Sequence, residues 1–121
     1  MNEIVEFITD RMAERAAEAH LVHALGCDAL SPCADGCCPM GTCDCGEPER
    51  ILADIAAKRA ILAAYVQAKA DFDAAAPHAR DVSPFDGGIL TGHMVGLREA
   101  VTMLAAEFTG HPKYKPEWSV A

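Results

Sequence analysis

Six apolar residues in the last third of the chain are spaced four, three, four, three and four positions apart. This spacing places them on one side of an α-helix, as in helices that pack side by side through a continuous seam. We therefore expect a helix over residues 89–109 whose seam lies in the core. The seam residues are Leu90, Met94, Leu97, Val101, Leu104 and Phe108.

Two earlier segments show the same helical periodicity. Residues 3–25 carry apolar side chains every three or four positions, and Gly26 is a plausible stop. Residues 48–76 begin with Pro48, which suits a first helical position, and Pro77 ends them. The first stripe comprises Ile4, Ile8, Met12, Ala16, Ala19 and Val22, and the second comprises Ile51, Leu52, Ile55, Leu62, Tyr65, Val66 and Phe72.

The composition agrees with closely packed helices. The chain has many alanines, aromatic residues make up only 6% of it, and no segment alternates with the period of a strand. Its 121 residues suit a single domain. The expected fold is all-α: a three-helix bundle-like domain over residues 1–121, with a Cys-rich loop at 26–47 and a further loop at 77–88.

The tail at 110–121 contains Tyr114 and Trp118, the latter the only tryptophan. We expect this aromatic tail to dock on the bundle, with a free recognition motif as the alternative. In the third helix, Gly92 and Gly96 lie four positions apart. They either let another helix approach closely or simply weaken the helix.

The Cys-rich loop carries the strongest chemical signal. Its pattern is C-x5-C-x3-C-C-x4-C-x-C, in a segment that Gly and Pro interrupt too often for a helix. Thiolates bind zinc tetrahedrally, so the loop is expected to be closed by a structural zinc ion. Gly46 after Cys45 supports this, because glycine lets backbone N–H groups turn toward the sulfur. The preferred ligands are Cys33, Cys38, Cys43 and Cys45, with Cys37 interchangeable with Cys38 and Cys27 a possible replacement.

Three other states of the cysteines compete with zinc. An even number of cysteines permits three disulfides in an oxidising compartment. An iron–sulfur cluster also takes four thiolates, although the spacing does not match the common ferredoxin patterns. The thiols can also be unligated.

The histidines and carboxylates give weaker signals. His20 and His23 lie three apart and could ligate a metal together, although surface or hydrogen-bonded histidines are commoner. Asp71 and Asp73 are two apart, so on a helix they point apart and form no catalytic pair. No nucleophile has a recognisable partner and no glycine loop matches a phosphate-binding motif, so we expect no enzymatic activity.

The charge distribution excludes several classes of partner. The net charge is −8, and the Cys-rich loop carries Asp28, Asp35, Asp44 and Glu47 with no Lys or Arg. A chain without a basic patch is not expected to bind nucleic acid or anionic membranes. No targeting segment or apolar span is recognisable, so a cytoplasmic location is expected. A homo-oligomer through the third-helix seam is a further possibility.

Three stretches together resemble a known family. They are residues 4–8 (IVEFI), residues 48–59 (PERILADIAAKR) and residues 111–118 (HPKYKPEW). In this order they resemble a family of small uncharacterised proteins from actinobacteria and their bacteriophages, although the Cys-rich loop departs from the usual pattern. The resemblance covers about a third of the chain. It implies an actinobacterial or phage origin and brings no known activity.

These features favour a small accessory protein. The leading hypothesis is a non-enzymatic protein that binds another protein, which would be a host factor if the chain is phage-encoded, with its acidic zinc loop as the contact. The alternative is a metal- or redox-responsive thiol protein, since six thiols within nineteen residues can buffer or sense a metal.

Overall fold

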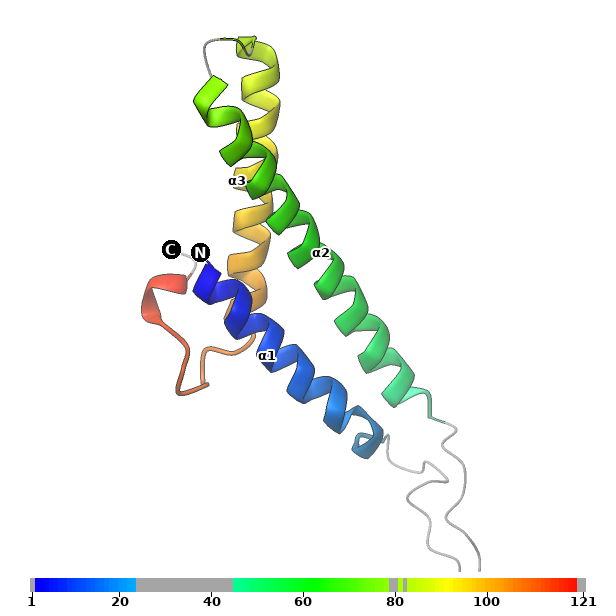
Figure 1. The fold of residues 1–121 in the computed structure, drawn as a ribbon. Helices are drawn as coiled ribbons and strands as arrows, with labels where there is room; N and C mark the ends of the chain where they lie inside the picture. Colours follow the sequence, from blue (N-terminus) through cyan, green and yellow to red (C-terminus); the bar gives the residue numbers. More distant parts are fainter. Residues whose placement is uncertain (1, 24–44, 79–80, 82, 120–121) are drawn as a thin grey trace, which may run out of the picture. The chain divides into compact units, whose positions relative to one another are not determined.

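The computed structural model describes residues 2–23, 45–78, 81 and 83–119, and these residues are helical with no strand (Figure 1). The predicted all-α class and the three α-helices are therefore confirmed for the described part of the chain. The elements are α1 (Asn2–Glu18), η1 (Ala19–Leu21), α2 (Glu47–Ala75), η3 (Ala76–His78), α3 (Pro84–Ala106) and η4 (Pro116–Trp118), where η denotes a 3₁₀ turn.

Helix α1 is shorter than the sequence predicts. The expectation of a helix to residue 25 is wrong, because α1 ends at Glu18 and a 3₁₀ turn follows. Val22 is extended, with φ −97° and ψ 113°, and its N–H donates to the Ala19 carbonyl. Beyond the buried Ala19, the side chains of Leu21 and Val22 are exposed. Burial of an apolar face therefore no longer supports the helix past this point.

Helix α3 begins five residues earlier than the expected residue 89, so the predicted loop at 77–88 is too long. Ser83 caps the helix: its hydroxyl accepts the Asp86 N–H at 3.1 Å and donates to the Asp86 carboxylate at 2.8 Å. Pro84 occupies the first helical position, where its fixed φ suits the helix. This capping arrangement starts α3 even though Gly87 and Gly88 follow at once.

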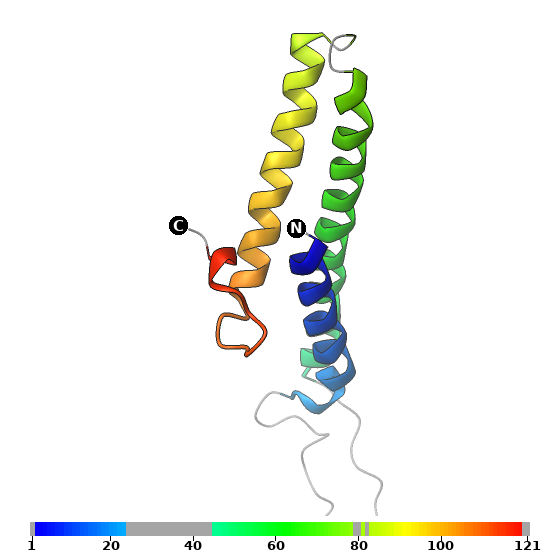
Figure 2. The same ribbon diagram turned by 60° about the vertical axis from the view of Figure 1, so that its left-hand side comes forward.

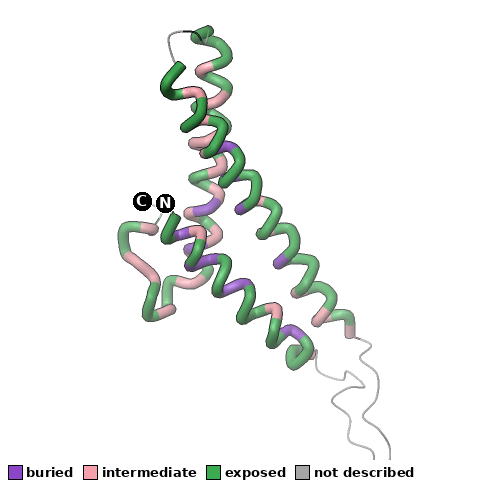
Figure 3. The backbone as a smooth tube through the Cα atoms, in the orientation of Figure 1, coloured by how far each residue is buried: buried purple, intermediate pink, exposed green. Residues whose placement is uncertain are grey.

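The chain forms two compact units, Met1–Arg11 with Ala57–Ala121, and Met12–Ala56. In the first unit, α3 lies beside the C-terminal part of α2 (Figure 2), and Figure 3 marks the buried positions along these helices. Val101 of the predicted seam is fully buried and its other five members are half-buried. The core of this unit comprises Ile4, Phe7, Ile8, Arg11, Leu62, Tyr65, Ala68, Val101 and Ala105.

Among the residues of the second unit that the structure describes, the buried side chains are Met12, Ala19 and Ile55. The stripe predicted for the second helix is too wide. Leu52 and Val66 were expected in the core, but each is about half exposed. The side chains buried on α2 form a narrower stripe, with spacings of seven, three and three positions, at Ile55, Leu62, Tyr65 and Ala68.

An aromatic cluster, defined by Phe7, Phe108, His111, Tyr114 and Trp118, holds the tail against the start of α1. The Phe7 ring centroid lies 5.0 Å from that of Trp118, 5.5 Å from His111, 6.1 Å from Phe108 and 6.2 Å from Tyr114. Such edge-on and tilted contacts suit the charge distribution of aromatic rings. The tail residues that the structure describes are therefore packed against α1 by one central ring.

The cationic side chains of Arg11 and Lys115 border this cluster. The Arg11 guanidinium lies 5.4 Å from the Phe7 ring centroid and also contacts the His111 ring. The Lys115 ammonium binds the Glu3 carboxylate at 2.8 Å and lies 5.8 Å from the Trp118 centroid. The tail is thus fixed to α1 by ring packing with an ion pair at its edge. None of the helices in the described residues has the length and apolar composition needed to cross a membrane.

Candidate metal centre

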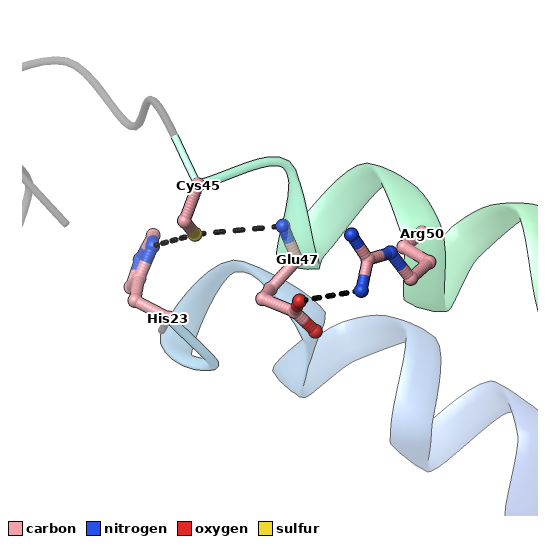
Figure 4. A network of polar contacts seen from close by, with 4 residues as sticks. All are labelled: His23, Cys45, Glu47 and Arg50. Atoms are coloured by element: carbon pink, nitrogen blue, oxygen red, sulfur yellow. Dashed lines mark hydrogen bonds and ion pairs between the residues drawn. The ribbon is translucent and has the colours of Figure 1, made fainter. Parts of the chain in front are cut away.

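His23 follows the 3₁₀ turn that ends the first helical segment. Its ring turns back along the chain, and the Nε2–H donates to the carbonyl oxygen of His20 at 2.8 Å. This bond fixes the orientation of the imidazole and leaves Nδ1 available to a second group. The fixed ring points its Nδ1 toward Cys45, as the close view shows (Figure 4).

Cys45 stands immediately before α2. The following Gly46 has a φ of +70°, a conformation that residues with a side chain rarely adopt. This turn directs the Glu47 N–H at the Cys45 sulfur, to which it donates at 3.4 Å. The same turn starts α2, because the Arg50 N–H donates to the Gly46 carbonyl at 3.0 Å and the Arg50 guanidinium pairs with Glu47 at 2.9 Å.

The two half-buried side chains meet across 22 positions of sequence. Cys45 Sγ lies 3.7 Å from His23 Nδ1. The hydrogen bond that the protonated His23 ring donates to the Cys45 sulfur raises the pKa of His23; burial of the ring opposes the rise, while the His20 carbonyl and the charge of Glu49 add to it. A cationic imidazolium beside the sulfur in turn favours the thiolate form of a cysteine.

The geometry of this pair fits a metal as well as a proton. Two ligands bound tetrahedrally to one zinc ion, a sulfur and an imidazole nitrogen, stand about 3.6 Å apart. Metal-binding histidines also commonly donate their second ring N–H to a backbone carbonyl, as His23 does to His20. A backbone N–H donated to the thiolate sulfur completes the outer contacts. His23 and Cys45 thus form half of a possible tetrahedral site.

The structure places only one of the sequence-predicted ligands. Cys45 lies in the described residues, whereas the other predicted ligands lie outside them. Among the residues that the structure describes, no group of three or more His, Cys, Asp or Glu side chains is arranged to hold a metal. The predicted ligands outside the described residues are Cys27, Cys33, Cys37, Cys38 and Cys43.

From the sequence, His23 was only a weaker candidate for a metal ligand, outside the preferred cysteine set. The sequence suggested that His20 and His23 could ligate together on one helix face. Because α1 ends at Glu18, the two do not share an α-helical face, and His20 contributes its carbonyl to His23. The sequence feature that could have selected His23 as a ligand is its position directly before the Cys-rich segment.

The other described histidines take different roles. His111 lies in the aromatic cluster, where its Nδ1 accepts the Lys113 N–H at 3.1 Å. His78 and His93 are exposed. These three are therefore not part of the His23–Cys45 pair.

A family model covers nearly the whole chain. Residues 1–120 match the family of unknown function DUF6221. No curated protein and no solved structure matches the chain significantly. The match spans α1, the Cys-rich segment, α2, α3 and the aromatic tail together. The chain therefore belongs to the family of unknown function DUF6221.

Proposed function

We propose that the chain is a small, non-enzymatic accessory protein that binds another protein through its Cys-rich segment, which a structural zinc ion organises. The observation that carries this proposal is the pairing of Cys45 with His23, at 3.7 Å between sulfur and nitrogen. The pair brings the two flanks of the Cys-rich segment together at a spacing that suits a shared metal.

The proposed ligand set combines the pair with the intervening thiols. Cys45 supplies one ligand and His23 replaces one of the four cysteines that the sequence favoured. Two further ligands come from the remaining cysteines of the segment: Cys27, Cys33, Cys37, Cys38 and Cys43. A glycine at positive φ directly after Cys45, with a backbone N–H on its sulfur, supports Cys45 as a permanent member.

Energetic reasoning supports a metal in this role. The segment between His23 and Cys45 contains Gly, Pro and Asp and few large apolar residues. Ordering a chain costs about 1–2 kcal/mol per residue in backbone entropy, and such a segment has little burial to offset it. A metal that binds only the closed form contributes its binding free energy to closure.

The partner proposed for this surface is a protein with a basic patch. The segment carries Asp28, Asp35, Asp44 and Glu47 without a single Lys or Arg. Thiolate ligands add negative charge around a zinc ion, so the closed segment concentrates charge of one sign. Such a surface steers a basic partner and repels nucleic acid and anionic membranes. An actinobacterial or phage origin, with the cytoplasm as compartment and a host factor as partner, belongs to the same proposal.

The metal is tested on protein purified under reducing conditions and loaded with zinc. Native mass spectrometry is expected to find one zinc per chain. His23→Ala should lower the zinc affinity by more than about tenfold, as loss of a ligand or its orienting partner does. His20→Ala is the matched control, because only the backbone carbonyl of His20 contacts His23. Equal affinities for the two variants would remove His23 from the site.

The partner is tested with the same variants. Immobilised wild-type protein, loaded with zinc or stripped by chelator, is exposed to host lysate, and retained proteins are identified by mass spectrometry. A basic protein retained by the loaded form and by His20→Ala, but lost from the stripped form and from Cys45→Ser, supports the proposal. Retention independent of the metal contradicts it. A metal-free chain whose mass corresponds to three disulfides contradicts the zinc site itself.

The contact between Cys45 and His23 favours a second candidate function, a metal- or redox-responsive thiol protein. An imidazolium beside a thiol stabilises the thiolate, which is the form that binds metals and reacts with oxidants. The two functions differ in reversibility. A structural zinc ion resists mild chelators and oxidants, whereas a sensor releases it under both, and stopped-flow chelation of loaded protein separates them.

A further inference from the structure

One face of α3 is apolar and points into solvent. Phe85, Ile89 and Met103 are 76%, 54% and 59% exposed. At 3.6 residues per turn these three positions fall on the same side of the helix, opposite the half-buried seam. Large apolar side chains exposed together on one face are uncommon on an isolated protein and mark contact surfaces.

Three glycines continue this face between the large residues. Gly88, Gly92 and Gly96 are four positions apart, and a Cβ added at any of them would meet nothing within 4 Å. Packing within the chain therefore does not require glycine at these positions, and each glycine weakens the helix relative to alanine. Glycines at this spacing let the backbone of a second helix approach closely.

The α3 face also carries little charge. Helix α3 has three charged residues in 23, namely Asp86, Arg98 and Glu99, whereas the 17 residues of α1 contain seven. A second copy of this chain also has a net charge of −8, so like charges repel over most of both surfaces. The charge-poor face of α3 is where two copies meet with the least repulsion.

Most of the large and small residues along this face are placed symmetrically about position 94, with the exception of Ile89, which corresponds to Glu99. Position 94 lies midway between Gly92 and Gly96, between Gly88 and Ala100, and between Phe85 and Met103. If two copies of α3 cross antiparallel at this level, small residues oppose small ones at the crossing. Phe85 of each copy then opposes Met103 of the other, where the helices diverge and larger side chains are needed to fill the gap.

We propose that two copies of this chain associate through the outer face of α3, antiparallel and related by a two-fold axis at the level of residue 94. The sulfur of Met103 then contacts the Phe85 ring, a favourable pairing. A parallel arrangement would place Glu99 against its own counterpart, whereas the antiparallel one places it against Ile89 and opposes the helix dipoles favourably. This face replaces the seam expected from sequence, whose members are buried or half-buried within the chain.

Sedimentation velocity of the full chain under reducing conditions tests the association, with and without chelator. The wild type is expected to dimerise with increasing concentration whether or not zinc is present, which separates this proposal from the metal site. Phe85→Lys and Met103→Glu should each weaken the dimer at least about tenfold, because each substitution removes a contact that the two-fold axis repeats. Val66→Lys, at a similarly exposed position of α2, is the control.

The double variant Phe85→Lys/Met103→Glu tests the register. Lys and Glu meet across the interface only in the antiparallel pairing, so the double variant should recover most of the affinity that each single variant loses. Gly92→Leu should abolish the dimer, while Gly110→Leu, which also enters open space, should not. Circular dichroism checks that each variant keeps its helices.

The proposal is overturned by a wild type that stays monomeric to millimolar concentration. It is also overturned by a dimer that all the α3 variants leave intact, or that Val66→Lys weakens as much as Phe85→Lys does. Failure of the double variant to recover, with both single variants weakened, overturns the antiparallel register.

Discussion

The tail of the chain and the entry to α2 are held in place by different means. At the tail, the Phe7 side chain is only 5% exposed and touches four other rings. At the entry to α2, the polar contacts of the half-buried Cys45 include those with His23 Nδ1 and the Glu47 N–H. One segment is fixed by buried aromatic area and the other by a few directed contacts to one sulfur.

This difference has an energetic meaning. Burying an aromatic ring contributes several kcal/mol, which is enough to order a short tail without a cross-link. Hydrogen bonds to sulfur contribute little in water, so the contacts at Cys45 orient groups without holding a long segment closed. The aromatic cluster therefore holds the tail without a further ligand, whereas the Cys45–His23 pair would need a bound metal to hold its segment closed.

The largest expected effect comes from breaking the aromatic cluster. Phe7→Ala should destabilise the protein by about 3–5 kcal/mol, because it leaves a cavity at the centre of four rings. Thermal unfolding measures this loss, and a red shift of Trp118 fluorescence reports release of the tail. Phe85→Ala, measured on dilute protein, is the matched control and should change stability by no more than about 0.5 kcal/mol because Phe85 is exposed. Similar losses in both variants would contradict the central role of Phe7.

The second-largest effect is expected at the entry to α2, on removal of zinc. Chelation of zinc-loaded protein should lower hydrogen-exchange protection in residues 12–56 while Trp118 fluorescence stays unchanged. The reason is that the free energy of zinc binding stabilises the region around Cys45, whereas ring packing stabilises the tail. Cys45→Ser should reproduce the chelated state without chelator. A Trp118 signal that shifts on chelation would show that the two regions are not independent.

A smaller effect is expected at the start of α3, which belongs to neither region. Ser83→Ala removes the N-cap and should cost about 1 kcal/mol, while Ser83→Gly should cost only a few tenths. Denaturant titration measures both variants, with the Trp118 spectrum of the native state expected to stay that of the wild type. Equal costs for alanine and glycine would indicate that the hydroxyl does not cap the helix.

The smallest effect concerns the ion pair at the edge of the aromatic cluster. The hydrogen bond and charge of Lys115 lower the pKa of Glu3 below its ordinary 4.5. A lowered carboxyl pKa adds stability above the ordinary pKa and loses it as pH falls through the lowered value. Wild type should therefore melt slightly above Glu3→Gln at neutral pH, and the gap should close in acid. Because both side chains are well exposed, high salt should also close it. A gap that persists in acid would assign the effect to something other than charge.

Local sequence patterns predicted most of the helical content. Periodicity found the three helices, and the buried Ile4, Ile8 and Met12 lie on the expected face of α1. The start of α3 was missed because Ser83, Pro84 and two glycines read as a loop, although Ser83 with Asp86 three positions later is also a capping pattern. The start of α3 was misplaced because serine and proline are common both in loops and in the first positions of helices.

Long-range packing was beyond the reach of sequence. Phe7 and Arg11 are buried because tail residues about a hundred positions away cover them, and no local spacing records that contact. His23 shows the same limit in the candidate site. Its meeting with Cys45 depends on where α1 ends and where Gly46 turns the chain, which the helical pattern through residue 25 concealed.

The contact between the start of α1 and the tail can form only late in synthesis. Residues near Phe7 leave the ribosome long before His111, Tyr114 and Trp118 exist to cover them. Until then the Phe7 side chain lacks the rings that cover it and is open to other nascent chains, a risk that long-range contacts carry in general. A chain that is terminated before residue 108 therefore leaves Phe7 uncovered. Proteolytic loss of the last dozen residues would expose the same surface in a finished molecule.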